Sequence, residues 1–142
     1  MAPVRKGPAL KGEHEVLFAN DAFYQAFAER DLAAMDELWA RETPVACIHP
    51  GWEALAGRDA VLASWHAILE SPSAPRIRCL EPKVFAFGDV AFVICYEAIE
   101  RSVLVATNIF VREDGAWRLV HHQAGPTNHQ PKDEAEPSSS VH

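Results

Sequence analysis

The sequence predicts a single α+β domain, with helices in its first half and strands in its second half. Apolar residues recur at steps of three and four over residues 13–70, a period typical of amphipathic helices. Apolar runs separated by turn residues then fill residues 77–124, as expected of an antiparallel meander. With 142 residues, 49% of them hydrophobic and 23% charged, the chain has the length and composition of one globular domain.

The helices are expected first. Residues 13–30 place their apolar side chains on one helical face: Val16, Ala19, Phe23, Ala26 and Phe27, with Leu17 and Tyr24 widening this stripe. Asp31 can cap a second, shorter helix by accepting hydrogen bonds from free amides of its first turn, and Pro44 closes this helical hairpin. A third helix is expected over residues 57–70.

The strands follow. Residues 45–49 form a short strand candidate that ends in a tight turn at Pro50-Gly51. Four longer strands are expected over residues 77–87, 90–99, 103–112 and 116–124, the last two joined by a hairpin at Asp114-Gly115. Several of these strands are apolar on both faces. One face must then meet the helices, and we expect the other face to form a homodimer through the sheet.

The ends of the chain have a different composition. Residues 1–12 contain prolines, glycines and cations, and we expect a flexible arm there. Residues 128–142 carry prolines, three consecutive serines and acidic residues, which indicates a disordered tail. The folded domain is therefore expected to span residues 13–127.

Local motifs of this domain resemble those of a known family. They are Phe23…Phe27…Arg30-Asp31, the segment from Cys47 to Trp52, Gly57-Arg58 with Ser64-Trp65, Gly88-Asp89-Val90-Ala91, Ala106-Thr107-Asn108 with Phe110, and the segment from Gly115 to His122. Together they resemble SnoaL-like domains of the NTF2-like superfamily. The resemblance implies a cone in which three N-terminal helices pack on a curved antiparallel sheet around a pocket, usually in a dimer. Some relatives transfer protons without a cofactor, whereas others are dehydratases, cyclases, transport factors or oligomerisation modules.

Two histidines are the candidate proton carriers. His49 ends the first short strand, in the region where isomerase-like relatives carry an acid–base carboxylate, and no Asp or Glu lies between Thr43 and Trp52. Imidazole can replace a carboxylate because it titrates near neutral pH. A hairpin at Asp114-Gly115 places His121 opposite Asn108. His121 is then expected to face the pocket, with His122 on the outer or dimer face.

Five further residues are candidates for ligand contact: Trp52, Trp65, Glu97, Asn108 and Phe110. The register places Phe110 opposite Leu119 on the pocket face, while the two tryptophans suit the walls of an apolar site. Glu97 joins this face if the turn near Glu100-Arg101 has two residues, and leaves it if the turn has three. All candidates except Phe110 also have a structural explanation. The histidines and tryptophans then serve the core or a turn, Asn108 a strand edge, and Glu97 is a solvated or dimer-interface carboxylate.

Other classes of function find less support. A net charge of −7 and the absence of a basic run argue against nucleic acid and against anionic membranes as partners. Cys47, Cys79 and Cys95 are widely spaced in apolar runs, which indicates buried thiols in a reducing compartment. We therefore expect a cytoplasmic protein. No histidine pair or carboxylate spacing supports a metal, and no glycine-rich phosphate loop indicates a nucleotide cofactor.

The sequence thus predicts a protein that binds a small apolar ligand, with cofactor-free acid–base catalysis of the isomerase, dehydratase or cyclase type as its chemistry if it is an enzyme. The alternative is a non-catalytic, dimeric association module whose cavity is filled by side chains. An open pocket with inward polar groups distinguishes the first from the second.

Overall fold

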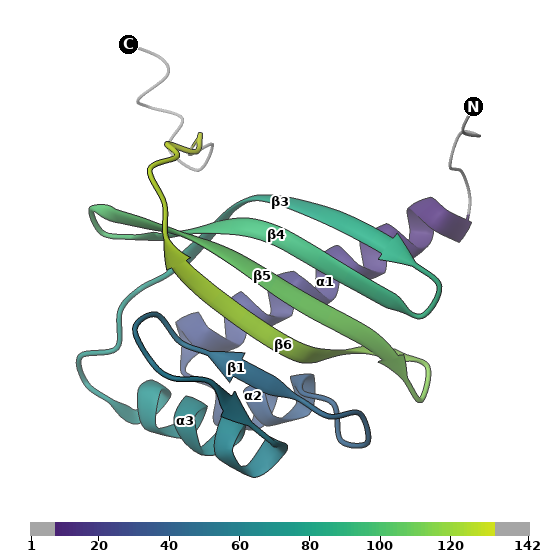
Figure 1. Cartoon of the computed structure of the whole chain (residues 1–142), viewed down its shortest axis with the longest axis horizontal. Coiled ribbons are helices and arrows are strands. Elements are labelled where there is room, and N and C mark those ends of the chain that lie inside the picture. Colours follow the sequence, from purple (N-terminus) through teal and green to yellow (C-terminus); the bar gives the residue numbers. More distant parts are fainter. Residues whose placement is uncertain (1–7, 133–142) are drawn as a thin grey trace.

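The structure is a computed structural model that describes residues 8–132, and it has one six-stranded sheet with three helices. The helices are α1 (Pro8–Glu29), α2 (Leu32–Leu38) and α3 (Arg58–Glu70). The strands are β1 (Ala46–Ile48), β2 (Leu55–Ala56), β3 (Arg78–Phe87), β4 (Val90–Ile99), β5 (Ser102–Glu113) and β6 (Ala116–Pro126). Their order across the curved sheet is β2-β1-β6-β5-β4-β3 (Figure 1).

The sheet is mixed, so the prediction of a purely antiparallel sheet is wrong at one point. Strands β3 to β6 form the expected antiparallel meander, but β1 pairs in parallel with β6, with Ala46 beside His121. The meander leaves one side of β6 unpaired, and the short β1 fills that side. Strand β2 was not expected, because two residues are too few to show a period in the sequence.

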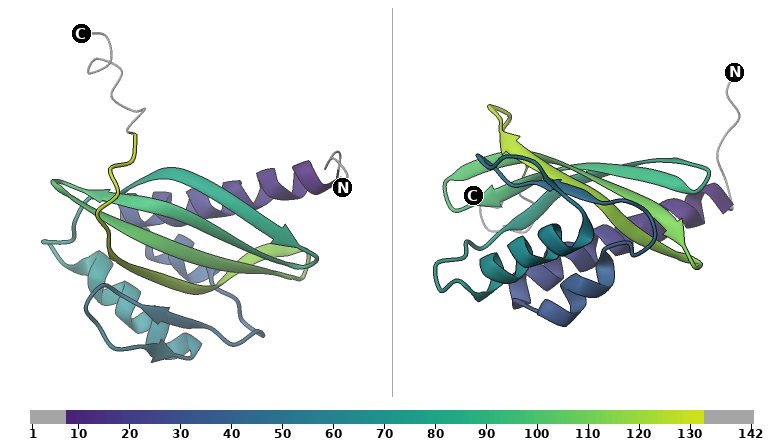
Figure 2. Two further views of the ribbon diagram at one scale, coloured as in Figure 1. Left: turned by 45° about the horizontal axis from the view of Figure 1, so that its top comes forward. Right: turned by 60° about the horizontal axis from the view of Figure 1, so that its bottom comes forward.

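Helices cover one face of the sheet, which we call the inner face (Figure 2). The apolar stripe of α1 is buried as expected, and α2 and α3 supply Met35, Trp65 and Leu69 to the same core. Cys47 and Cys95 are also buried, and all three cysteines are free thiols. The opposite, outer face carries no helix within residues 8–132.

Local signals place the starts of α2 and α3 close to where the sequence predicts them. The Asp31 carboxylate caps α2 by accepting a hydrogen bond from the Ala34 amide at 3.0 Å. Gly57 precedes α3 with a φ of +93°, a conformation that glycine adopts without strain. Helix α1 begins at Pro8, earlier than the expected Glu13, so residues 8–12 of the predicted arm are helical.

The hairpins decide which side chains reach the inner face. Ile99 pairs with Ser102, so the β4–β5 turn has two residues, and Glu97 lies on the inner face. Phe110 pairs with Leu119 as expected.

A β-bulge then shifts the register between Ile109 and Phe110, with Val120 as the extra residue of β6. Asn108 consequently pairs with His122 rather than with His121, and the prediction for these two histidines is reversed.

Both predicted terminal segments lie partly outside the described residues. These parts are residues 1–7 of the arm and residues 133–142 of the tail. Residues 128–132 have no regular secondary structure, yet they contact the sheet. The His129 ring lies 4.5 Å from that of Tyr96, and the Lys132 amide donates to the Glu81 carboxylate at 2.8 Å. No helix of the described chain is both long enough and apolar enough to span a membrane.

Candidate functional site

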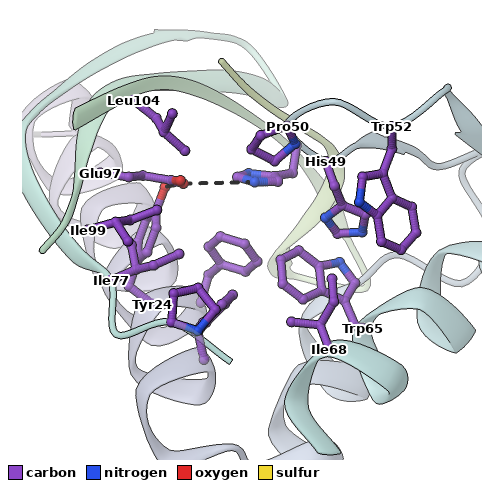
Figure 3. Close-up of a pocket in the computed structure, with 14 residues that line it drawn as sticks. Tyr24, His49, Pro50, Trp52, Trp65, Ile68, Ile77, Glu97, Ile99 and Leu104 are labelled. Atoms are coloured by element: carbon purple, nitrogen blue, oxygen red, sulfur yellow. Dashed lines mark hydrogen bonds and ion pairs between the residues drawn. The ribbon is translucent and has the colours of Figure 1, made fainter. Parts of the chain in front are cut away.

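An apolar cavity of about 230 Å³ lies between the inner face of the sheet and the helices (Figure 3). Its apolar walls come from α1, α3, the loop after α3 and the strands β4 and β5: Phe23, Phe27, Trp65, Ile68, Pro75, Ile77, Ile99 and Leu104. Four polar side chains join this lining: Tyr24, His49, Glu97 and His122. A cavity of this size suits a compact ligand, since sites for drug-sized molecules are larger.

Glu97 and His122 form the polar floor of the cavity. They come from β4 and β6, and Glu97 Oε2 lies 3.8 Å from His122 Nε2. Figure 3 marks this contact with a dashed line from the Glu97 carboxyl across the hollow. This separation is longer than a hydrogen bond, so the two groups do not bind each other directly. A polar atom of a ligand can therefore contact both groups at once.

Burial makes Glu97 an unusual carboxyl group. Glu97 is only 2% exposed, and this burial raises the pKa of its carboxyl group to about 6. A hydrogen bond from Tyr24 opposes the rise. The Tyr24 hydroxyl donates to Glu97 Oε2 at 2.6 Å. A carboxyl group with this pKa exchanges protons close to neutral pH, which is the range that a general acid–base catalyst needs.

A hydrogen-bond chain fixes the protonation of His122. The Asn108 amide nitrogen donates to Asn20 Oδ1 at 2.8 Å and to the Tyr24 hydroxyl at 3.1 Å, which leaves Asn108 Oδ1 as an acceptor. His122 Nδ1 lies 2.5 Å from that oxygen, so Nδ1 carries the proton and Nε2 turns a lone pair toward Glu97.

The charge state of His122 follows from its surroundings. Burial, together with repulsion from the imidazoles of His49 and His121, lowers the pKa of His122 to about 3. His122 is therefore neutral at pH 7, and its contact with Glu97 is not an ion pair at that pH.

His49 borders the same cavity near its mouth. Its Nε2 lies 2.9 Å from Ser64 Oγ, whose hydroxyl donates to the Val61 carbonyl at 2.7 Å. The Ser64 oxygen is then an acceptor, so His49 carries its proton on Nε2 and has a lone pair on Nδ1. Burial lowers the pKa of His49 to about 4, which makes this imidazole neutral as well.

The two tryptophans enclose His49. Its ring centroid lies 4.7 Å from those of both Trp52 and Trp65. Trp65 is buried beneath the cavity, whereas Trp52 is 47% exposed at its mouth. The aromatic rings around this neutral imidazole make the surroundings of His49 largely apolar.

The structure brings together four of the seven predicted site residues: His49, Trp52, Trp65 and Glu97. Asn108 and Phe110 are buried behind the cavity wall, where Asn108 holds His122 and Phe110 packs in the core. The predicted position of His121 is wrong. Because of the bulge at Val120, His121 lies on the outer face, and its imidazole contacts Gln123 at 3.4 Å.

Sequence reasoning missed two residues of the site. His122 takes the place expected for His121, and the apolar pair Leu119-Val120 does not by itself reveal a bulge. Tyr24 was assigned only to the apolar stripe of α1. A tyrosine on a buried helical face does carry a signal, since its hydroxyl requires a polar partner there.

Comparisons with known proteins agree with this fold. A protein of the NTF2-like family from Streptomyces avermitilis, which carries a provisional dehydratase assignment, is 31% identical over 85% of this chain and 99% of its own, with a TM-score of 0.77. A domain from Thiobacillus denitrificans, provisionally assigned as a calcium/calmodulin-dependent protein kinase type II association domain, is 33% identical over 89% of this chain and 100% of its own, with a TM-score of 0.69.

One curated relative is a longer protein. F-box protein SKIP8 from Arabidopsis thaliana is 26% identical over 77% of this chain, which spans about half (48%) of the length of that relative. A family model described as the SnoaL-like domain matches residues 16–127, which is most of the sequence. The chain therefore belongs to the SnoaL-like domain family and has the NTF2-like fold.

Proposed function

We propose that this protein binds a compact apolar molecule and catalyses cofactor-free proton transfer on it, in a dehydration or an isomerisation. One observation carries the proposal: the Glu97 carboxyl and the His122 imidazole face each other across 3.8 Å at the floor of an apolar cavity. Polar groups converging on an apolar hollow are typical of small-molecule sites.

Glu97 is the proton carrier in this proposal. With a pKa of about 6 it is mainly a carboxylate at pH 7, and it can remove a proton from a carbon next to a substrate carbonyl. As a carboxylic acid it then returns the proton. Return to another carbon completes an isomerisation, and return to a hydroxyl group two carbons from the carbonyl releases water and leaves a double bond.

The two neutral imidazoles position the substrate. His122 accepts a hydrogen bond from a substrate hydroxyl through Nε2, because Nδ1 is bound to Asn108. His49 can accept another at Nδ1 near the cavity mouth, because its Nε2 proton is bound to Ser64. In this account His121 has no catalytic role.

The similar proteins do not decide between catalysis and association. The neighbour with the dehydratase assignment and the neighbour with the association-domain assignment have nearly equal identities, 31% and 33%. The cavity favours catalysis, because the alternative predicts a hollow filled by side chains, whereas this one is open and bordered by four polar groups.

Proton transfer can be tested with a simple ketone, 4-phenylbutan-2-one. Exchange of its α-protons in D₂O is followed by NMR, and its binding is followed by calorimetry. We expect the wild-type protein to accelerate exchange and Glu97→Gln to reduce that rate at least ~100-fold with little change in ketone affinity. Equal rates for wild type, Glu97→Gln and buffer would refute the catalytic proposal. Failure of the ketone to bind would refute the ligand site as well.

The outer face of the sheet supports a second proposal, a homodimer. Phe85 is 43% exposed and Phe87 60% exposed, and Phe85 stacks on Phe92 with ring centroids 4.8 Å apart. Apolar surface of this kind is typical of protein interfaces. A second copy of the chain is the proposed partner, and we expect sedimentation at micromolar concentration to give the mass of a dimer. A monomer there would refute it.

A further inference from the structure

A second hollow, which we call the basic groove, adjoins the cavity. It has a volume of about 740 Å³ and lies between the end of α1, the loop after α3, and the neighbouring ends of β3 and β4. The cavity and the basic groove share three wall residues: Phe27, Pro75 and Ile77. The two hollows are therefore adjacent and lie on either side of this shared wall.

The charge of the basic groove is opposite to that of the whole chain. Its lining contains three cations, Arg30, Arg76 and Arg78, and one acidic residue, Glu100. The whole protein has a formal net charge of −7, because its 20 acidic residues outnumber its 13 lysines and arginines. Cations gathered in a hollow raise the local concentration of anions, and guanidinium groups match the planar geometry of oxyanions.

The structure holds part of this groove in place and leaves one cation available. Arg30 donates from Nη1 to the Ser71 carbonyl at 2.7 Å, which ties the end of α1 to the loop after α3. Arg76 is exposed, and among residues 8–132 its guanidinium has no hydrogen-bond or ion-pair partner. It follows directly after Pro75, a residue of the shared wall.

We infer that the ligand of the cavity carries an oxyanion, such as a carboxylate or a phosphate, that Arg76 of the basic groove binds. The apolar part of the ligand occupies the cavity beside Glu97 and His122, and the anionic end crosses Pro75 to reach Arg76. This inference rests on the proposed function, since it takes the cavity as the ligand site. It narrows the substrate class from apolar molecules to amphipathic acids.

Matched pairs of probes test the inference. The acids are 4-phenylbutyrate, 6-phenylhexanoate and 8-phenyloctanoate, and each is compared by calorimetry with the alcohol of the same length. We expect the acid to bind more tightly than its alcohol by roughly fivefold or more once the chain is long enough to cross the wall, since an exposed charge pair contributes up to about 1 kcal/mol. Raising the salt to about 1 M should remove this advantage by screening.

Two variants test whether the basic groove causes the tighter binding of the acid. Arg76→Gln should bring the affinity for the acid down to that for the alcohol, and the unchanged affinity for the alcohol shows that the variant is folded. Arg41→Gln is the matched control, because Arg41 lines neither hollow and pairs instead with Glu37 at 2.9 Å. It removes the same charge, and we expect it to keep the preference for the acid.

The other outcomes separate the two proposals. If every alcohol binds as tightly as its acid, or if Arg41→Gln loses as much affinity as Arg76→Gln, the inference is overturned and the cavity remains a ligand site. If neither acids nor alcohols bind, the proposed function is overturned together with it.

Discussion

The ionisation of Glu97 offers a test that needs no substrate. Its folded-state pKa of about 6 lies above the usual 4.5, so the folded protein favours the protonated carboxyl. The stabilisation linked to this shift is fully present below pH 4.5 and is lost as the pH rises through 6. Glu97→Gln keeps the shape of the side chain and removes the charge. At high pH the variant should therefore be more stable than the wild type.

The rise of this pKa from 4.5 to about 6 sets the size of the effect. At 1.36 kcal/mol per unit, it corresponds to about 2 kcal/mol above pH 7 and to less than about 1 kcal/mol at pH 5. The change between these two pH values, about 1 kcal/mol in favour of the variant, is the quantity to measure. Any constant effect of the amide itself cancels in that difference.

Urea unfolding of wild type and variant at pH 5, 6 and 7.5 provides the measurement. Glu113→Gln is the control, because hydrogen bonds from the amides of Arg41, Glu42 and Thr43 lower the pKa of Glu113 to about 2. The contribution of the Glu113 carboxylate to stability is lost only in acid. The difference in unfolding free energy between Glu113→Gln and wild type should therefore stay constant between pH 5 and 7.5. The reasoning about burial fails if the Glu97→Gln difference is equally constant.

Three further outcomes are expected. Tyr24→Phe removes the hydrogen bond that lowers the pKa of Glu97, so the pH midpoint of α-proton exchange should rise by about one unit, and an unchanged midpoint would contradict the role of this bond. Asn108→Leu leaves the His122 Nδ1–H without an acceptor and should lower the free energy of unfolding by about 2–3 kcal/mol, measured in urea. Phe92→Lys on the outer face should give a monomer in sedimentation, and a variant that remains dimeric would place the interface elsewhere.

Most of the fold could be predicted because its signals are local. The stripe of α1, the cap at Asp31 and the hairpin at Asp114-Gly115 each depend on a few neighbouring residues. The parallel pairing of β1 with β6 could not be predicted in this way, since it joins Ala46 to His121, far apart in the sequence.

The site was predictable to a smaller extent. The face on which Glu97 lies depends on whether the turn between β4 and β5 has two or three residues, and the sequence allows both lengths. The structure has the two-residue turn, which places Glu97 on the inner face. His121 was misplaced because strand alternation holds only without a bulge, and one extra residue exchanges the faces of all residues beyond it. Tyr24 forms a hydrogen bond with a strand distant in sequence, which periodicity alone does not show.

The pairing of β1 with β6 also has a consequence for synthesis on the ribosome. His49 follows β1, whereas His122 lies in β6, the last strand within residues 8–132, so both sides of the cavity exist only after β6 has left the exit tunnel. A nascent chain that ends before Ala116 lacks the His122 side of the cavity floor and leaves one edge of β5 open. Contacts between such remote segments close late in folding. A bound ligand should therefore protect the whole domain against unfolding rather than one half of it.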